Sequence, residues 1–312
     1  MDMKHIDKNR IIVSILLVTL FYIAFTIFSD IDKIKNDYQN FNIFYFLPIL
    51  PILFLSIFFR SLIQKYLLKK LNIEISLKSS FMIFLGGYSM IITPGGVGLI
   101  IKCYLIEKKY GYKISKSMPL VFAERFYDVL AVQVIILMTL FLFFSEISII
   151  LFIISISCLI LVLFLIKIKK FNYILIKIAT KLKILNTNKE EHKNFLDGLN
   201  IIFESKLFLK ISIMITALVF FEGIIFYLIF QIFGINIGYV ESIQIYYTSM
   251  LLGALTLLPA GIGAIDGIFV VLLSQKNIPL HLATSIILFM RFMSIWLLSG
   301  IGIIISLKYF SK

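Results

Sequence analysis

The sequence predicts an all-α protein that crosses a membrane several times and contains two helical hairpins broken in the middle. Of its 312 residues, 60% are hydrophobic, whereas an ordinary soluble domain is about half apolar. Several apolar runs approach the roughly 20 residues that a helix needs to cross the hydrocarbon core. Two further apolar stretches are interrupted by proline and glycine. These three observations together exclude a water-soluble fold.

Six segments are long and apolar enough for complete crossings. They are Ile11–Phe28, Ile43–Phe59, Met118–Phe144, Ile147–Ile166, Leu207–Phe233 and His281–Leu307. The first follows several basic residues, as a signal peptide would, but its 18 residues exceed the usual apolar core of about 7–15. We therefore expect a retained first span.

The two interrupted stretches are Ser79–Ile106 and Glu241–Leu273. Proline removes a helix donor and glycine loosens the backbone, so each stretch should form two short helices that meet at a break. The breaks are Thr93-Pro94-Gly95-Gly96-Val97-Gly98 and Leu258-Pro259-Ala260-Gly261-Ile262-Gly263. An arm such as 80–93 spans only about 20 Å, too little to cross the bilayer. We expect two re-entrant hairpins whose breaks face the protein interior, because lipid cannot satisfy irregular backbone.

The two hairpins belong to an internal repeat. Three pairs of motifs align within one residue: the two breaks, Asn72-Ile73 with Asn236-Ile237, and Arg125-Phe126 with Arg291-Phe292. Three predicted crossings separate the copies, so the second copy should be inverted, as in many secondary transporters. A purely structural duplication is the alternative. We expect one integral membrane domain over residues 1–312, with repeats at about 72–144 and 236–307.

Basic residues predict the orientation of the chain. Four basic clusters would lie on the side of the N-terminus, whereas the opposite side receives only Lys33, Lys35 and Lys276. This bias places both termini in the cytoplasm, with the chain in the plasma membrane. The cytoplasmic connector at about 167–206 should include a basic amphipathic helix over 171–185, followed by an exposed turn at Asn186–Asn194.

Charged residues interrupt the predicted spans. Each would cost at least about 2.5–3.5 kcal/mol at a lipid-exposed helix centre, so they should turn inward and pair. Arg125 and Asp128 share a helix face and can bridge. Glu124 and Asp128 also share a face but repel, so a cation must lie between them or one carboxyl must keep its proton. A structural ion-pair network and a conduit for a headgroup and protons both remain open.

The arginines that follow the breaks suggest a phosphate site. A guanidinium fork near open helix N-termini suits a phosphate. Lys102 and Asp266 could line the cavity or anchor a hairpin end, and Gly263 with Gly267 could only serve close helix packing. The candidate substrate-binding residues are Arg125, Arg291, Glu124, Asp128, Pro94, Gly95, Gly96, Gly98, Pro259, Gly261, Gly263, Asp266 and Lys102.

The two breaks and the intervening Glu124-Arg125-Phe126-Tyr127-Asp128 element resemble the lysylphosphatidylglycerol synthase transmembrane family, also described as the UPF0104 or flippase-like membrane domain. The resemblance covers nearly the whole chain. It implies a lipid-handling domain, which in some members moves aminoacylated phospholipid between leaflets. Enzymatic members carry a separate soluble transferase domain. We expect no lipid aminoacylation here, because the sequence between Met1 and Lys312 contains no such domain.

Three functions follow as hypotheses. The first is a flippase-like transporter of an anionic or polyprenyl-phosphate lipid, and the second is a membrane enzyme acting on a lipid phosphate. The third is a non-transporting scaffold for lipid enzymes. Cys103 and Cys158 lack a CxxC spacing, and no metal or cofactor motif is found. The net charge of +13 lies in clusters between spans, which favours contact with anionic lipid rather than nucleic acid.

Overall fold

The computed structural model describes residues 19–91, 100–142, 189–256 and 258–309, with isolated helical positions between 153 and 180. Regular structure in these ranges is helical. Three helices there are long and apolar enough to cross a membrane, Ile43–Lys70, Ser205–Ile232 and Leu280–Tyr309. They coincide with three predicted spans. A fourth prediction is recovered as a 29-residue helix, α7 (Ile114–Leu142), which carries three charges near its middle.

Other predicted segments fall partly or wholly outside the described residues. The first span is described only as the apolar helix Thr19–Phe28. The predicted crossing at Ile147–Ile166 and the amphipathic helix over 171–185 lie largely outside the described ranges, as does the first break with Pro94, Gly95, Gly96 and Gly98.

The described chain forms two compact units. The first unit draws on residues 19–55, 88–91 and 222–301, and the second on 56–87, 100–142, 189–221 and 302–309. Some boundaries between the units fall within helices. The helices α4 (Ile49–Lys70) and α11 (Ser205–Ile232) each contribute one part to each unit.

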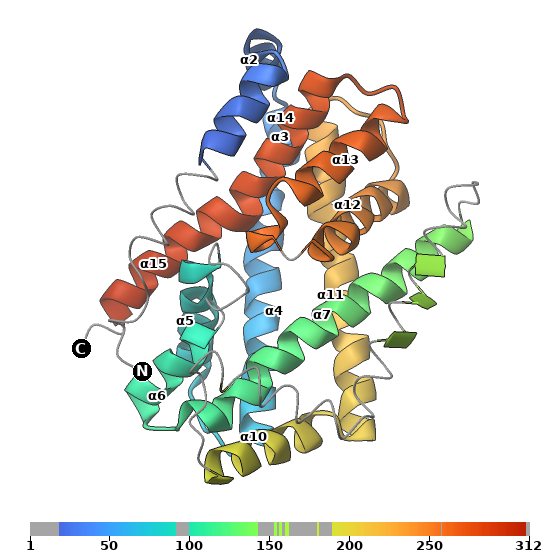
Figure 1. Cartoon of the computed structure of the whole chain (residues 1–312). Helices are drawn as coiled ribbons and strands as arrows, with labels where there is room; N and C mark the ends of the chain where they lie inside the picture. The colour runs from blue at the N-terminus through green and yellow to red at the C-terminus, as the bar shows by residue number, and fades with distance from the viewer. Residues whose placement is uncertain are drawn as a thin grey trace. The chain divides into compact units, whose positions relative to one another are not determined.

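In the first unit, two short helices flank the second break. The helix α12 (Tyr239–Ala254) precedes the 3-10 turn η4 (Pro259–Gly261), and α13 (Ala264–Ser274) follows it. The two helices pack against each other, and α13 also packs against α14 (Leu280–Arg291), as Figure 1 shows. Gly253 makes this approach possible, because a Cβ there would lie 2.9 Å from the backbone nitrogen of Ile265.

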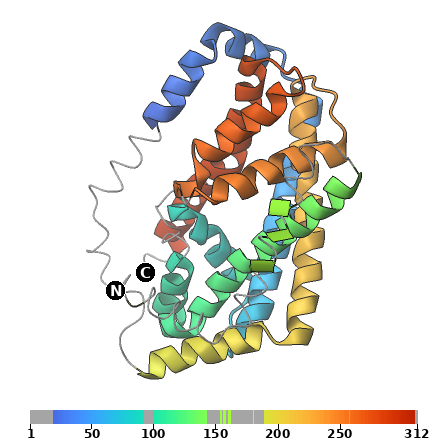
Figure 2. The ribbon, with the colours of Figure 1, turned by 45° about the vertical axis from the view of Figure 1, so that its right-hand side comes forward.

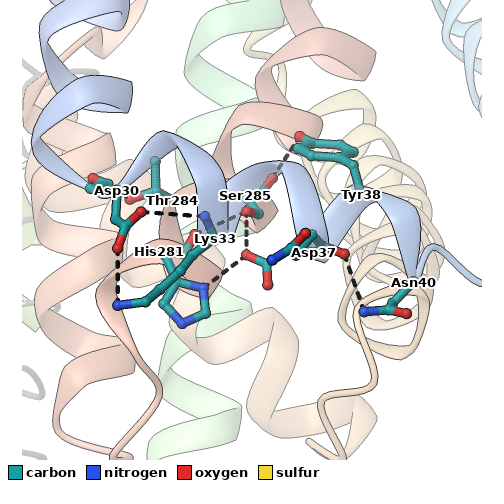
Figure 3. Close-up of polar contacts among 10 residues, drawn as sticks. Asp30, Lys33, Asp37, Tyr38, Asn40, His281, Thr284 and Ser285 are labelled. Atoms are coloured by element: carbon teal, nitrogen blue, oxygen red, sulfur yellow. Dashed lines mark hydrogen bonds and ion pairs between the residues drawn. The ribbon is translucent and has the colours of Figure 1, made fainter.

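A short amphipathic helix, α2 (Ile31–Gln39), is fastened to the start of α14. Figure 3 shows the Asp37 carboxylate between two groups of α14, with Oδ2 3.0 Å from Nδ1 of His281 and 2.8 Å from Oγ of Ser285. The hydroxyl of Tyr38 donates to the Ser285 carbonyl at 3.0 Å.

The first turn of α2 has its own cap. Asp30 accepts a hydrogen bond from the backbone amide of Lys33 and forms an ion pair of 2.9 Å with its ammonium group. These bonds to Lys33 lower the pKa of the Asp30 carboxyl below its ordinary value. The cap therefore favours the charged form of Asp30, which also suits the helix dipole.

In the second unit, α6 (Ile101–Tyr110) packs against both α5 (Leu77–Gly87) and α7. A further helix, α10 (Lys189–Ile202), packs along α7, as Figure 2 shows. The hydroxyl of Tyr127 on α7 donates to the carbonyl of Ile202 at the end of α10, at 3.0 Å. Within this unit, α7 is therefore in contact with both α6 and α10.

The predicted exposed turn at Asn186–Asn194 is wrong from Lys189 onward, because α10 begins there. Two acidic residues in its first turn, Glu190 and Glu191, complement the helix dipole. Phe195, Leu199 and Ile202 recur at helical spacing and are buried. The helix is therefore stabilised both by its end and by its apolar face.

Helix α10 can lie close to α7 because residue 198 is glycine. A Cβ at Gly198 would meet the Pro119 ring at 2.6 Å and a methyl group of Leu71 at 3.2 Å. We predict that Gly198→Ala lowers the free energy of unfolding by about 1–3 kcal/mol, because the rigid ring cannot yield without moving α10. Thermal unfolding of the purified protein in detergent measures this loss.

The matched control is Gly300→Ala, on the helix α15 (Leu297–Tyr309), where no described atom lies within 4 Å of the added methyl group. That change should be neutral or stabilise by up to about 1 kcal/mol, because alanine favours helix over glycine. Equal stability of the two variants would contradict the close packing of α10.

Candidate functional site

The charged side chains at the middle of α7 form a cluster with two neighbouring helices of the second unit. We call this group the α7 charge cluster. Its members come from α4, α6 and α7: Arg60, Lys102, Glu124, Arg125 and Asp128. Arg60 was not predicted from the sequence, since it follows an apolar run and is 68 positions from its partner.

Lys102 and Glu124 neutralise each other in the interior of this unit. The lysine Nζ lies 2.7 Å from Oε2 of Glu124, and the Lys102 side chain is only 2% exposed. The Lys102 side chain passes over Gly87, where an added Cβ would lie 2.6 Å from the lysine Cε. The lysine ammonium group lies 4.1 Å from the centre of the Phe84 ring. Lys102 therefore joins α6 to both α5 and α7.

Asp128 is shared by two arginines. Its Oδ1 is 2.7 Å from Nη1 of Arg60, and its Oδ2 is 3.3 Å from Nη2 of Arg125. The predicted pairing of Arg125 with Asp128 is thus confirmed. Each of the two carboxylates on α7 has a cation of its own, Glu124 with Lys102 and Asp128 with Arg60. This differs from the single cation between them that the sequence analysis offered as one solution to their repulsion.

The charges of the α7 charge cluster do not cancel. Within these five residues, three cations face two carboxylates, which gives the group a formal surplus of one positive charge as far as the described chain shows. The surplus falls on Arg125, whose side chain is 45% exposed, while those of Arg60 and Asp128 are 18% and 12% exposed. Arg125 is therefore the cation of this cluster that an external anion can reach.

A small crevice lies within the cluster. Its volume of about 20 Å³, lined by Arg60, Glu124, Arg125 and Asp128 with three apolar side chains, suits one water molecule rather than a phosphate. Oε1 of Glu124 is buried and has no hydrogen-bond partner among the described residues. The crevice itself is therefore too small for a phosphate, and only the exposed side of Arg125 has room for a larger anion.

The second break is a left-handed turn of backbone. Ala260, Gly261 and Gly263 have φ values of 50°, 64° and 84°. Glycine adopts such values without strain, whereas alanine does so at a cost. The backbone here cannot form helix hydrogen bonds in the regular way, so its carbonyl groups need other donors.

Arg291 provides those donors. Its Nη1 donates to the Ala260 carbonyl at 3.2 Å and its Nη2 to the Gly261 carbonyl at 3.3 Å. Its Nε donates to Oδ1 of Asp266 at 2.6 Å, and the Arg291 side chain is only 5% exposed. All three guanidinium nitrogens are therefore hydrogen-bonded, two to carbonyl groups of the break and one to Asp266 on α13.

Asp266 completes this brace. Its Oδ2 accepts from the backbone amide of Gly263 at 2.7 Å and from the hydroxyl of Tyr22 at 3.4 Å. The carboxylate is fully buried. Of the two roles that the sequence left open for Asp266, the structure shows the anchoring contacts.

The two predicted arginines lie in different units and have different surroundings. Arg291 is enclosed by protein partners, whereas Arg125 is half exposed and makes one ion pair among the described residues. The two glycines that the sequence analysis considered for helix packing also differ: Gly263 has a positive φ, while no described atom lies within 4 Å of a Cβ at Gly267. Close helix packing falls instead to Gly253, which the sequence interpretation missed.

The two predicted breaks are followed by opposite charges at similar positions. Lys102 lies eight residues after Pro94, and Asp266 lies seven residues after Pro259. Each pairs with a residue of the next long helix, Lys102 with Glu124 and Asp266 with Arg291. A buried ion pair therefore fastens α6 to α7, and another fastens α13 to α14.

Comparison with known proteins agrees with the resemblance seen in the sequence. Residues 11–302 match the family described as the lysylphosphatidylglycerol synthase TM region. A UPF0104 membrane protein of Methanocaldococcus jannaschii is 26% identical over 204 residues, which cover 65% of this chain and 86% of the relative. A UPF0104 membrane protein of Methanothermobacter thermautotrophicus is 29% identical over 119 residues, or 38% and 35% of the two chains.

The brace at the second break can be tested by a double-mutant cycle. Arg291→Gln leaves the Asp266 carboxylate buried without its cation, so we expect a loss of about 3–5 kcal/mol in unfolding free energy. Adding Asp266→Asn should restore part of this loss, because the unpaired charge disappears. Denaturation of the single and double variants in detergent measures both effects.

Lys276→Gln provides the control for this cycle. Lys276 pairs with Glu241 but is 46% exposed, so its loss should change stability by at most about 1 kcal/mol. Strictly additive effects of the two brace substitutions would show that Arg291 and Asp266 do not act as a pair.

Proposed function

The chain belongs to the family of the lysylphosphatidylglycerol synthase transmembrane region, and on this premise we propose that it moves an anionic lipid between the leaflets of a membrane. The proposal includes phospholipids and polyprenyl phosphates as substrates. The observation that carries it is the surplus positive charge of the α7 charge cluster, exposed at Arg125. The membership supports a lipid-related role, and the charge supports an anionic headgroup.

The position of Arg125 explains why an anion is expected. A cation on a membrane-crossing helix is costly unless it is paired. Asp128 is already paired with Arg60 at 2.7 Å, and its contact with Arg125 is the longer one at 3.3 Å. A phosphate at Arg125 would supply the missing negative charge, and the planar guanidinium can bind two of its oxygens.

Glu124 supports a headgroup that also donates a hydrogen bond. Its Oε2 is bound by Lys102, but its buried Oε1 is unused within the described chain. A hydroxyl or ammonium group of a lipid headgroup would satisfy this oxygen, and so would a proton on the carboxyl group. In the proposed role, Arg125 holds the phosphate and Glu124 selects among headgroups or exchanges a proton.

The second break supports a re-entrant hairpin as part of the same proposal. At helical rise, α12 and α13 with their 16 and 11 residues span about 24 and 16 Å, less than the roughly 30 Å of hydrocarbon. The buried brace from Arg291 satisfies the break without water. We further propose that the first hairpin enters from the opposite face, as an inverted repeat with cytoplasmic termini would require.

Transport in reconstituted vesicles tests the proposal. We predict that Arg125→Gln slows movement of a fluorescent phosphatidylglycerol by roughly ten- to a hundred-fold, the effect of losing one charged hydrogen bond of about 1.5–3 kcal/mol. Arg125→Lys keeps the charge but loses the fork, so it should retain part of the rate. Recovering the lipid afterwards and finding it chemically unchanged separates transport from enzymatic conversion.

Lys113→Gln is the matched control, since Lys113 forms an exposed pair with Glu190 at 3.6 Å. It should transport at the rate of the unmodified protein. Unchanged transport by a folded Arg125→Gln protein would refute the assignment of the phosphate to Arg125.

A further inference from the structure

A groove with a volume of about 620 Å³ lies between α4 and α11 in the second unit. Its size falls within the range of about 300–1,000 Å³ that is common for ligand pockets. Phe59 and Ile63 on α4 and Met214 and Ala217 on α11 are among its apolar walls. The groove is distinct from the crevice of the α7 charge cluster.

One end of the groove carries a cation. The ammonium group of Lys210 lies 4.6 Å from the centre of the Tyr66 ring and 3.5 Å from its hydroxyl. The apolar wall continues from there along α11 to Ala217, seven residues away, or about 10 Å at helical rise. The groove therefore has a positively charged end and an apolar length.

The surroundings of the groove decide its occupant. Both of its walls belong to helices that are long and apolar enough to cross a membrane, so acyl chains are the apolar molecules within reach. Phe59 and Met214 are 47% and 41% exposed, so the groove is open for a chain to enter from the side. In a phospholipid, a charged phosphate is joined to an apolar acyl chain. The groove has the same order, with the charged end at Lys210 followed by apolar walls.

The groove adjoins the α7 charge cluster. Ile63 lines both the groove and the crevice that contains Arg125. On α11, Ile215 lines the crevice and lies five residues after Lys210, or about 7.5 Å along the helix. A headgroup at Lys210 would thus be about one and a half turns from the level of the cluster.

We propose that this groove is a loading site for an anionic phospholipid, with one acyl chain between α4 and α11 and the phosphate at Lys210. The inference rests on the proposed function for its purpose, which is to deliver the headgroup to Arg125. Binding itself is independent of transport. The Tyr66 hydroxyl contributes a second hydrogen-bond donor at the charged end, beside the ammonium group.

Photolabelling of the full chain in vesicles tests the site. The probe is phosphatidylglycerol with a photoactivatable group in its acyl chain, and mass spectrometry identifies the labelled peptides. We expect labels on α4 and α11 that Ala217→Trp lowers at least tenfold, because the indole fills the groove. Ile213→Trp is the control, since Ile213 lies on the same helix, is 61% exposed and does not line the groove.

Lys210→Gln tests the charged end while leaving the walls intact. It should lower the preference for phosphatidylglycerol over phosphatidylcholine about fivefold, which corresponds to about 1 kcal/mol for one lysine near a membrane surface. Labelling that is insensitive to Ala217→Trp, or a preference that is unchanged by Lys210→Gln, would show ordinary bilayer contact and overturn the loading site.

The same variants separate this inference from the proposed function. Groove labelling that responds to Ala217→Trp and Lys210→Gln, together with normal transport by Arg125→Gln, would keep the loading site and refute the role of Arg125. If Arg125→Gln slows transport while Ala217→Trp and Lys210→Gln change neither transport nor labelling, the loading site alone is refuted.

Discussion

Buried charge and broken backbone need partners within the protein wherever water is absent, and this constraint accounts for the strongest contacts of both units. Lipid offers no hydrogen bonds, so each polar group at membrane depth must find its partner in the chain. The partner of Lys102 is Glu124, and the partner of the carbonyl groups in the second break is Arg291. Both contacts fasten a short helix to the long helix that follows it. The polar groups thereby determine where the helices lie.

Arg125 gains its significance from the same rule. The other members of the α7 charge cluster are mostly buried and closely paired, whereas Arg125 is half exposed and shares a carboxylate that a second arginine already holds. A purely structural ion-pair network would give this surplus charge no role, whereas the proposed function does. A site that must bind and release an anion needs this arrangement, since a fully paired guanidinium would have no reason to exchange partners.

Local rules of sequence predicted the parts that depend on neighbours in the chain. The pairing of Arg125 with Asp128 follows from helix spacing, and the two short helices around the second break follow from Pro259 and its glycines. Partners far apart in the chain were beyond such rules, as Arg60 shows. The helix α10 was missed for another reason: its apolar residues recur at helical spacing in the sequence, but its polar first turn was assigned to an exposed turn. Tertiary approach through Gly253 and Gly198 leaves no periodic signal at all.

The repeat predicted from the sequence would give its two arginines equal surroundings, and the reversed ion pairs explain why the structure gives them different ones. In the second copy the anchoring charge after the break is Asp266, so its partner on the next helix must be a cation, and Arg291 is consumed by that task. In the first copy the anchor is Lys102, so its partner must be an anion, and Glu124 fulfils the role. Arg125 is the next residue, rotated by about 100° around the helix. Reversal of the anchor thus leaves Arg125 outside the buried pair, where the proposed function needs a cation.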